Sequence, residues 1–67
     1  MAVYKKIEIV GTSSKSYEEA IQNAIQQARR TLKGLSWFEV VEQRGNLQGS
    51  NVLFQATLKV GFEVMED

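Results

Sequence analysis

The alternation between residues 52 and 64 is the feature that most constrains the fold of this 67-residue chain. Every even-numbered position in this segment is apolar, whereas the odd-numbered positions are mostly polar. The apolar set is Val52, Phe54, Ala56, Leu58, Val60, Phe62 and Val64. Because successive side chains of a strand point to opposite faces, the pattern predicts a long antiparallel strand with one face on a core.

A helix is predicted between Ser16 and Gly34. Ser16 and Glu19 have the spacing of a capping box, in which the Ser16 hydroxyl accepts from the Glu19 amide and the Glu19 carboxylate reaches back. Gly34 is the expected C′ residue, and Leu35 would close a Schellman-type end. Apolar residues recur between these ends at the spacing of one buried stripe, at Tyr17, Ala20, Ile21, Ala24, Ile25, Ala28 and Leu32.

Two further strands are predicted, over Ala2–Val10 and Ser36–Arg44, because both segments are rich in β-branched residues and alternate. Gly11–Ser14 is a turn by composition, and Gly45–Asn51 is a loop. A strand–helix–strand crossover makes the first two strands parallel, so the third pairs antiparallel with both. We therefore expect one α+β domain over residues 1–67, of β-α-β-β type, with strand order 1-3-2 and a sheet that covers one helix.

The second strand carries Trp37, the single tryptophan of the chain. Uninterrupted alternation places Trp37 and Gln43 on one face of this strand and Phe38, Val40 and Arg44 on the other. Phe38 and Val40 belong to the more apolar face, so we expect them to join the helix in the core. Trp37 then faces away from the intrachain core.

Trp37 has two interpretations. A lone tryptophan in a small domain is commonly a core or interface residue. It is also suited to stack on an aromatic heterocycle, with Gln55 beside it on the neighbouring strand. An amide both donates and accepts, which fits a ring edge with alternating N–H and C=O groups. Arg44 could pair with a phosphate.

Composition excludes several functions. The chain has no cysteine and no histidine, so a nucleophilic dyad is hard to build, and a disulfide or structural zinc is not expected. Its formal net charge is zero, which argues against general nucleic-acid binding. No apolar run or signal sequence indicates a membrane or secretory destination, so we expect a cytoplasmic protein that is not an enzyme. Self-assembly is the remaining way to stabilise so small a domain.

Two other groups of residues have less specific interpretations. The turn Gly11–Ser14 precedes a helix, where phosphate can bind, but it lacks the P-loop lysine and the dinucleotide glycine pattern. Arg29, Arg30 and Lys33 complement the negative end of the helix dipole, and they could also line a surface for anions. The glutamates are interpreted as solvated, and no metal site is predicted.

The sequence closely resembles the dodecins, small flavin-binding proteins, over essentially its whole length. The matching segments are Tyr4–Ser13 (YKKIEIVGTS), Leu35–Val40 (LSWFEV), Glu42–Gly45 (EQRG) and Phe54–Phe62 (FQATLKVGF). Their order and spacing together make the match specific. The resemblance implies a sheet partly wrapped around the helix and a hollow homododecamer of cubic symmetry.

The resemblance also implies a ligand and a site. Flavins, FMN or riboflavin, would lie between subunits, stacked in pairs between symmetry-related copies of Trp37. Gln55 would bond the polar edge of the isoalloxazine, and Arg44 would hold the FMN phosphate. Coenzyme A is a further ligand that the resemblance implies. Some bacterial relatives have a second cation where this chain has Glu63, which puts the phosphate preference in question.

The implied function is flavin sequestration, storage or photoprotection, in which the indole quenches the excited flavin. The alternative is a structural shell, or a particle for coenzyme A or other anions, in which Trp37 packs against a neighbouring subunit and flavin binding is incidental. A flavin-dependent enzyme ranks last, because two stacked flavins leave no open ligand face for a substrate.

Overall fold

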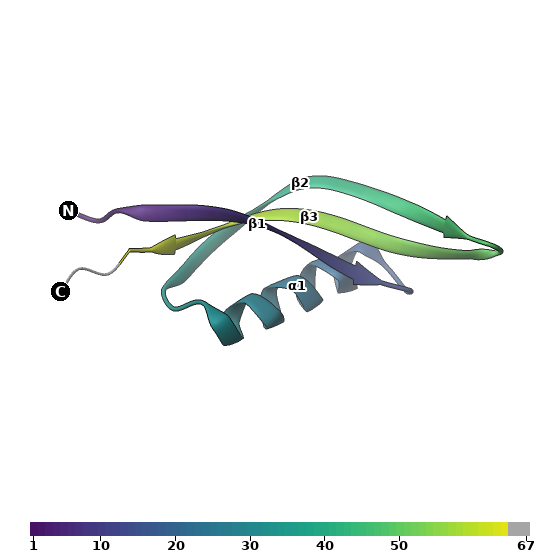
Figure 1. The fold of residues 1–67 in the computed structure, drawn as a ribbon, viewed down its shortest axis with the longest axis horizontal. Helices are drawn as coiled ribbons and strands as arrows, with labels where there is room; N and C mark the ends of the chain where they lie inside the picture. Colours follow the sequence, from purple (N-terminus) through teal and green to yellow (C-terminus); the bar gives the residue numbers. More distant parts are fainter. Residues whose placement is uncertain (65–67) are drawn as a thin grey trace.

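The computed structural model describes residues 1–64. The elements are β1 (Tyr4–Ser13), α1 (Tyr17–Thr31), β2 (Leu35–Gln48) and β3 (Asn51–Glu63). The three strands form one antiparallel sheet in the order β1-β3-β2, and α1 packs on one of its faces (Figure 1). The predicted element order, strand order and α+β class are confirmed. We call the face that carries α1 the inner face and the opposite face the outer face.

The predicted turn at residues 11–14 is wrong, because β1 continues to Ser13. Gly11 pairs with Ala56 on β3 and faces the helix. A Cβ atom at Gly11 would overlap the Ala20 carbonyl oxygen and lie 2.8 Å from the Ala24 Cβ. Here glycine allows a helix backbone to approach a strand closely, a role that composition alone does not distinguish from a turn.

Ser13, at the end of β1, changes the predicted cap of the helix. The Ser16 hydroxyl accepts a hydrogen bond from the Glu19 amide at 3.0 Å, as predicted. The Glu19 carboxylate does not reach back to Ser16, since it accepts from the buried Ser13 hydroxyl at 2.5 Å. The Ser13 oxygen also accepts from the Lys15 amide at 2.9 Å. The first turn of α1 is therefore tied to β1 through one buried hydroxyl.

The predicted Schellman end of α1 is wrong. The C-cap is Leu32, which is extended, and its amide donates to the Ala28 carbonyl at 2.9 Å. Gly34 has the left-handed φ of 74°, but it lies two residues after the cap. Its carbonyl accepts from the Glu63 amide at 3.1 Å. Gly34 thus joins the end of the helix to the end of β3.

Most of the predicted loop at residues 45–51 is strand. β2 runs to Gln48, and the residues 45–48 pair in register with β3 down to Asn51. Only Gly49 and Ser50 form the turn, and Gly49 has the positive φ of 60° that tight hairpins commonly need. Glycine and asparagine weaken strand propensity, but the ladder with β3 outweighs that preference.

The core of the subunit is small. Its buried hydrophobic residues are Ala20, Ala24, Ala28, Ala56, Leu58 and Val60. α1 lies over β1 and β3, where Gly11 lets it approach, and leaves β2 largely uncovered (Figure 1). The prediction that Phe38 and Val40 join this core is therefore wrong. Both lie on the inner face but remain 46% and 41% exposed.

The subunit is elongated. Its principal extents are 52, 20 and 14 Å, and its radius of gyration is 13.8 Å. A compact domain of this length would have about 11 Å. Both ends of the sheet project beyond α1, and one of them is the far half of the β2–β3 hairpin, residues 45–54 (Figure 1). We call this segment the hairpin arm. The helix contacts it only at its base, where Tyr17 of α1 packs edge-on against Phe54 with ring centroids 5.0 Å apart.

Candidate functional site

A β-bulge at Val41 alters which residues of β2 share a face. Val40 pairs with Leu58, but the next pair along the ladder joins Glu42 to Thr57. Val41 is the extra residue, and a bulge of this kind interrupts the simple alternation of a strand. A second irregularity lies at Ser36, between the first two pairs of β2.

The bulge brings Arg44 to the outer face. Arg44 lies opposite Gln55, whereas Gln43 lies opposite Ala56 on the inner face. The predicted faces of Arg44 and Gln43 are thus wrong, because one inserted residue shifts every later side chain by one position. Trp37 lies on the outer face as predicted, opposite Gly61. All three predicted site residues therefore share one face of the sheet.

The Trp37 indole lies across the middle strand at Gly61. A Cβ atom at Gly61 would overlap the indole and lie 2.6 Å from its Cη2 atom. The Tyr4 ring of β1 meets the indole edge-on, with ring centroids 5.1 Å apart and planes at 61°. Trp37 nevertheless stays 40% exposed. One side of the indole is supported by the sheet while the rest is open to a ligand or a neighbouring subunit.

Arg44 and Gln55 form a polar pair. The Arg44 Nε donates to the Gln55 Oε1 at 3.0 Å. The Gln55 amide nitrogen is then left with two N–H donors, and the terminal nitrogens of Arg44 remain to meet an anion. Thr12 lies opposite Gln55 on β1, in the same row of the outer face.

The aromatic and polar parts of the site are far apart within one subunit. Trp37 lies opposite Gly61, and Gly61 is six positions from Gln55 along β3. At ~3.4 Å per residue the separation is about 20 Å. The prediction that Gln55 lies beside Trp37 is therefore wrong for a single subunit. The prediction that Trp37 and Gln55 share a face is correct, but their separation depends on the register between β2 and β3.

A row of charges crosses the sheet between these two parts. Glu8, Lys59 and Glu39 lie opposite one another on β1, β3 and β2. The Lys6 ammonium lies 2.9 Å from the Glu39 carboxylate. The hydrogen bond and charge of Lys6, with a smaller contribution from Lys59, hold the pKa of Glu39 below its ordinary value. Both members of the ion pair are exposed, so its main effect is to organise the surface next to Trp37.

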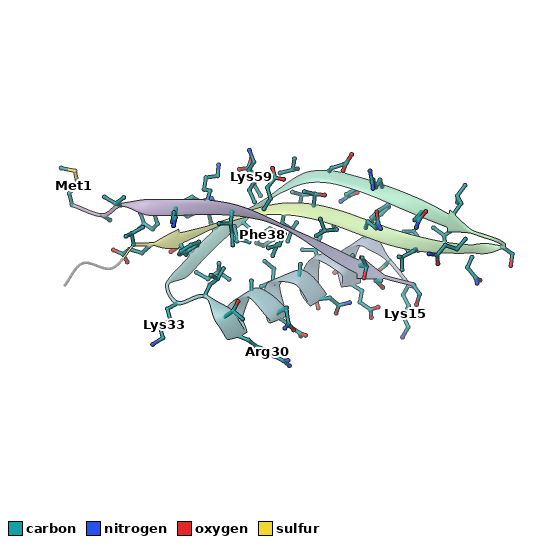
Figure 2. All side chains as sticks on the ribbon, in the orientation of Figure 1. Met1, Lys15, Arg30, Lys33, Phe38 and Lys59 are labelled. Carbon is teal, nitrogen blue, oxygen red and sulfur yellow. The ribbon has the colours of Figure 1, made fainter. Side chains whose placement is uncertain are left out.

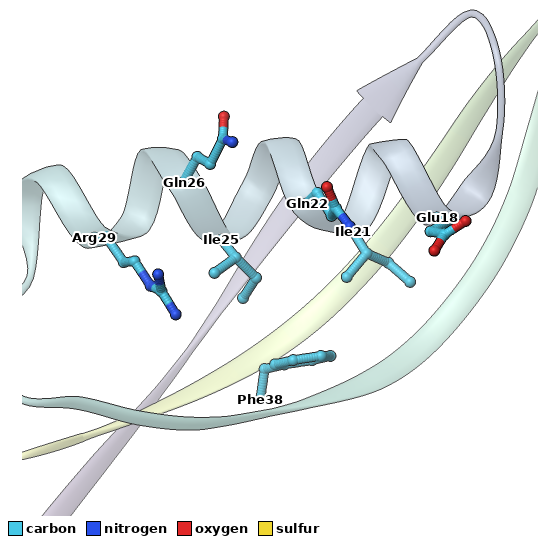
Figure 3. A pocket seen from close by; sticks show the side chains of 7 residues that line it. All are labelled: Glu18, Ile21, Gln22, Ile25, Gln26, Arg29 and Phe38. Carbon is cyan, nitrogen blue, oxygen red and sulfur yellow. The ribbon is translucent and has the colours of Figure 1, made fainter.

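The inner face has a separate surface groove. It has a volume of about 450 Å³ and lies between α1 and β2, where Phe38 faces Ile21 and Ile25 (Figure 3). Lys59 and Phe38 emerge from opposite faces of the sheet (Figure 2). The groove is therefore not continuous with the surface around Trp37.

Sequence reasoning missed the support of the indole by Gly61 and Tyr4. A glycine inside an otherwise regular strand often marks a close approach, so Gly61 was the available signal. Tyr4 gave none, because its contact with Trp37 depends on two strands that are not consecutive. Among residues 1–64, no three potential metal-binding side chains gather at one place, and no helix is long and apolar enough to span a membrane.

Comparison with known proteins shows the family of this chain. The sequence profile of the Dodecin family matches residues 3–65. The chain belongs to the dodecin family. It is 51% identical to a dodecin from Thermus thermophilus, over 96% of this chain and 94% of that one. It is 34% identical to a Mycobacterium tuberculosis protein named calcium dodecin, over 96% and 92% of the two chains.

The fold of the family is also that of this chain. The crystal structure of a single-substitution variant of the T. thermophilus dodecin matches with a TM-score of 0.93 at 48% identity, over the full length of both chains. Dodecin membership supports a small homo-oligomeric binding protein. The exposed inner and outer surfaces of the subunit are consistent with such an assembly.

Proposed function

We propose that this protein binds flavin, as FMN or riboflavin, between the subunits of a hollow homododecamer in the cytoplasm. It holds the flavin without turnover, and it quenches the excited state by contact with Trp37. The observation that carries the proposal is an indole laid on the sheet at Gly61, with its remaining surface open.

The open indole is suited to a flat aromatic ligand. Its exposed fraction is 40%, and the glycine beneath it lets the ring lie directly on the sheet. Stacking of an aromatic base on such a side chain contributes about 1–3 kcal/mol. Two subunits related by symmetry would present two indoles and enclose a stacked pair of ligands.

Polar recognition then requires more than one subunit. An isoalloxazine ring is too short to touch both Trp37 and Gln55 of one chain, which lie about 20 Å apart along β3. The Gln55 amide, whose oxygen is held by Arg44, would donate from another subunit to the carbonyl edge of the ring. The terminal nitrogens of Arg44 are suited to the FMN phosphate.

The distribution of exposed apolar residues supports assembly. On the inner face, Phe38, Val40, Leu47 and Val52 are all exposed, and Leu47 is 78% exposed. A large exposed apolar surface on so small a domain marks an interface. Enclosure by neighbouring subunits would also exclude a second substrate, so we infer storage and photoprotection and not catalysis.

A fluorescence titration tests the proposal. FMN and riboflavin are titrated with the flavin-free particle, whose mass is measured by light scattering, and coenzyme A is added as a competitor. We expect saturable quenching of flavin emission at one flavin per subunit, and tighter binding of FMN than of riboflavin. A large particle that quenches neither flavin would leave the structural shell as the function.

Variants separate the two parts of the site. Trp37→Ala should retain the particle but lose quenching. Arg44→Ala should weaken FMN at least tenfold more than riboflavin, since a charge-assisted contact with the phosphate contributes about 1.5–3 kcal/mol and only FMN has it. Arg30→Ala, on the exposed side of α1, is the matched control. Equal losses for both flavins in Arg44→Ala would contradict a phosphate role.

A further inference from the structure

Gly61 determines how closely the indole approaches the sheet. It is buried in the middle strand, opposite Trp37 on β2 and Lys6 on β1. The ring atoms Cε2, Cζ2 and Cη2 occupy the space that a side chain at this position would take. With any Cβ here, the ring would have to rise by about 1 Å to reach an ordinary contact distance of 3.5–4.0 Å.

Tyr4 limits the tilt of the same ring. Its phenol comes from the far edge strand and meets the indole at 61°, with a centroid distance of 5.1 Å. Edge-to-face contact is a favoured geometry for aromatic pairs. The indole is therefore held by β3 from beneath and by β1 at its side, although it is anchored on β2.

We infer that Gly61 and Tyr4 position the Trp37 indole at a fixed height and tilt, and that they thereby determine which stacked ligands the site accepts. The second half of this inference rests on the proposed function. If two indoles face each other, a rise of about 1 Å on each side narrows the gap by about 2 Å, more than half the thickness of an aromatic ring. The gap between the two indoles would then be too narrow for two stacked flavins.

The first experiment needs no ligand. Trp37 is the only tryptophan, so two signals report on it alone. They are the emission of selectively excited indole and the long-wavelength edge of the near-ultraviolet circular dichroism, where tyrosine does not absorb. In Gly61→Ala we expect stronger quenching of the indole by acrylamide and an altered dichroism band, in a particle of unchanged mass. Gly45→Ala is the matched control, since its Cβ would meet Val52 Cγ1 at 3.4 Å on the inner face.

Tyr4 gives a second, independent pair of variants. Tyr4→Leu removes the ring that meets the indole and should reduce the dichroism band, whereas Tyr4→Phe keeps the ring and should not. This pair decides the inference if Gly61→Ala fails to assemble. An unchanged indole signal in Tyr4→Leu and in any folded Gly61→Ala particle would overturn it.

The ligand experiment follows on the same variants. In Gly61→Ala we expect flavin binding to weaken by about tenfold, as expected if much of the stacking contribution is lost. Gly45→Ala should match the parent chain. A displaced indole with unchanged flavin affinity would overturn the specificity role. If the parent chain binds no flavin, the proposed function and the specificity role fail together, while the ligand-free signals still decide whether Gly61 and Tyr4 position the ring.

Discussion

The part of the sheet under α1 and the hairpin arm differ in how far their apolar side chains are buried. Under the helix, Leu58 and Val60 are fully buried and glycine lets two backbones meet. On the arm, Leu47 is 78% exposed although it lies on the inner face of the sheet, as the core residues do. Both regions have the sequence of a half-buried sheet, so the difference lies in what covers them. The helix covers the first region within the chain, whereas Leu47 on the arm is left exposed.

This contrast explains how so small a chain can be a stable protein. Among the residues that the structure describes, six hydrophobic residues are buried and four of them are alanine, so they provide little apolar burial. Domains of this size commonly gain the remaining stability from disulfides, metals or oligomers, and here cysteine and histidine are absent. In the assembly that we propose, neighbouring subunits would bury the apolar surface of β2 and of the hairpin arm.

The largest effect is expected from a charge on the arm. Leu47→Asp should prevent assembly, because burying an unpaired carboxylate at an interface costs about 3–5 kcal/mol. Light scattering would show a fall from the oligomer toward the 7.6 kDa chain. Ser14→Asp, in the exposed connection before α1, is the control. An intact oligomer in Leu47→Asp would show that the arm is a solvent-exposed extension.

A substitution that creates a cavity under α1 tests the part of the sheet that the helix covers. Leu58→Ala should lower the free energy of unfolding by about 2–5 kcal/mol, as large-to-small changes in cores do. The measurement is urea unfolding at fixed chain concentration, because assembly contributes to stability. Val10→Ala on the outer face of β1, where Val10 is 58% exposed, is the comparison. Equal losses would mean that assembly buries Val10 as fully as the helix buries Leu58.

The connection between β1 and α1 should matter less than the core. Ser13→Ala removes the donor to Glu19 and the acceptor for the Lys15 amide, and should cost about 1–2 kcal/mol of unfolding free energy. Ser36→Ala removes an exposed hydroxyl that donates to the Gly34 carbonyl, and should cost less. Urea unfolding of the two variants compares them directly, and a larger loss in Ser36→Ala would contradict this ranking.

The smallest effect is expected from pH. The pKa of Glu39 is lowered in the folded chain, so its ion pair with Lys6 stabilises the fold above the ordinary value of 4.5 and loses that contribution as the pH falls through the lowered pKa. Carboxyl NMR titration should show the pKa of Glu39 returning toward 4.5 in Lys6→Ala. Lys5→Ala, on the inner face, should leave it lowered.

The elements were predictable because their signals are local. The alternation of residues 52–64 indicated β3, and the apolar stripe with the Ser16 cap indicated α1. The 1-3-2 order followed from the direction of each strand. The family resemblance named Trp37, Gln55 and Arg44, and all three lie on one face in the structure.

The errors share one cause. Gly11–Ser14 and Gly45–Gln48 contain turn-forming residues, but each continues a strand because a partner strand satisfies its backbone. Arg44 changes face because of the bulge at Val41, and Phe38 stays uncovered because α1 lies toward β1. None of these outcomes is encoded within a few neighbouring residues.

By itself the sequence determined the helix, the three strands, their order and the need for partners, since period, capping and composition act over short range. The tertiary structure alone decided the register, the bulge and the position of the helix over the sheet. Those depend on pairing and packing between segments distant in the chain. They place the indole on Gly61 and bring Arg44 to Gln55, about 20 Å from the indole along β3.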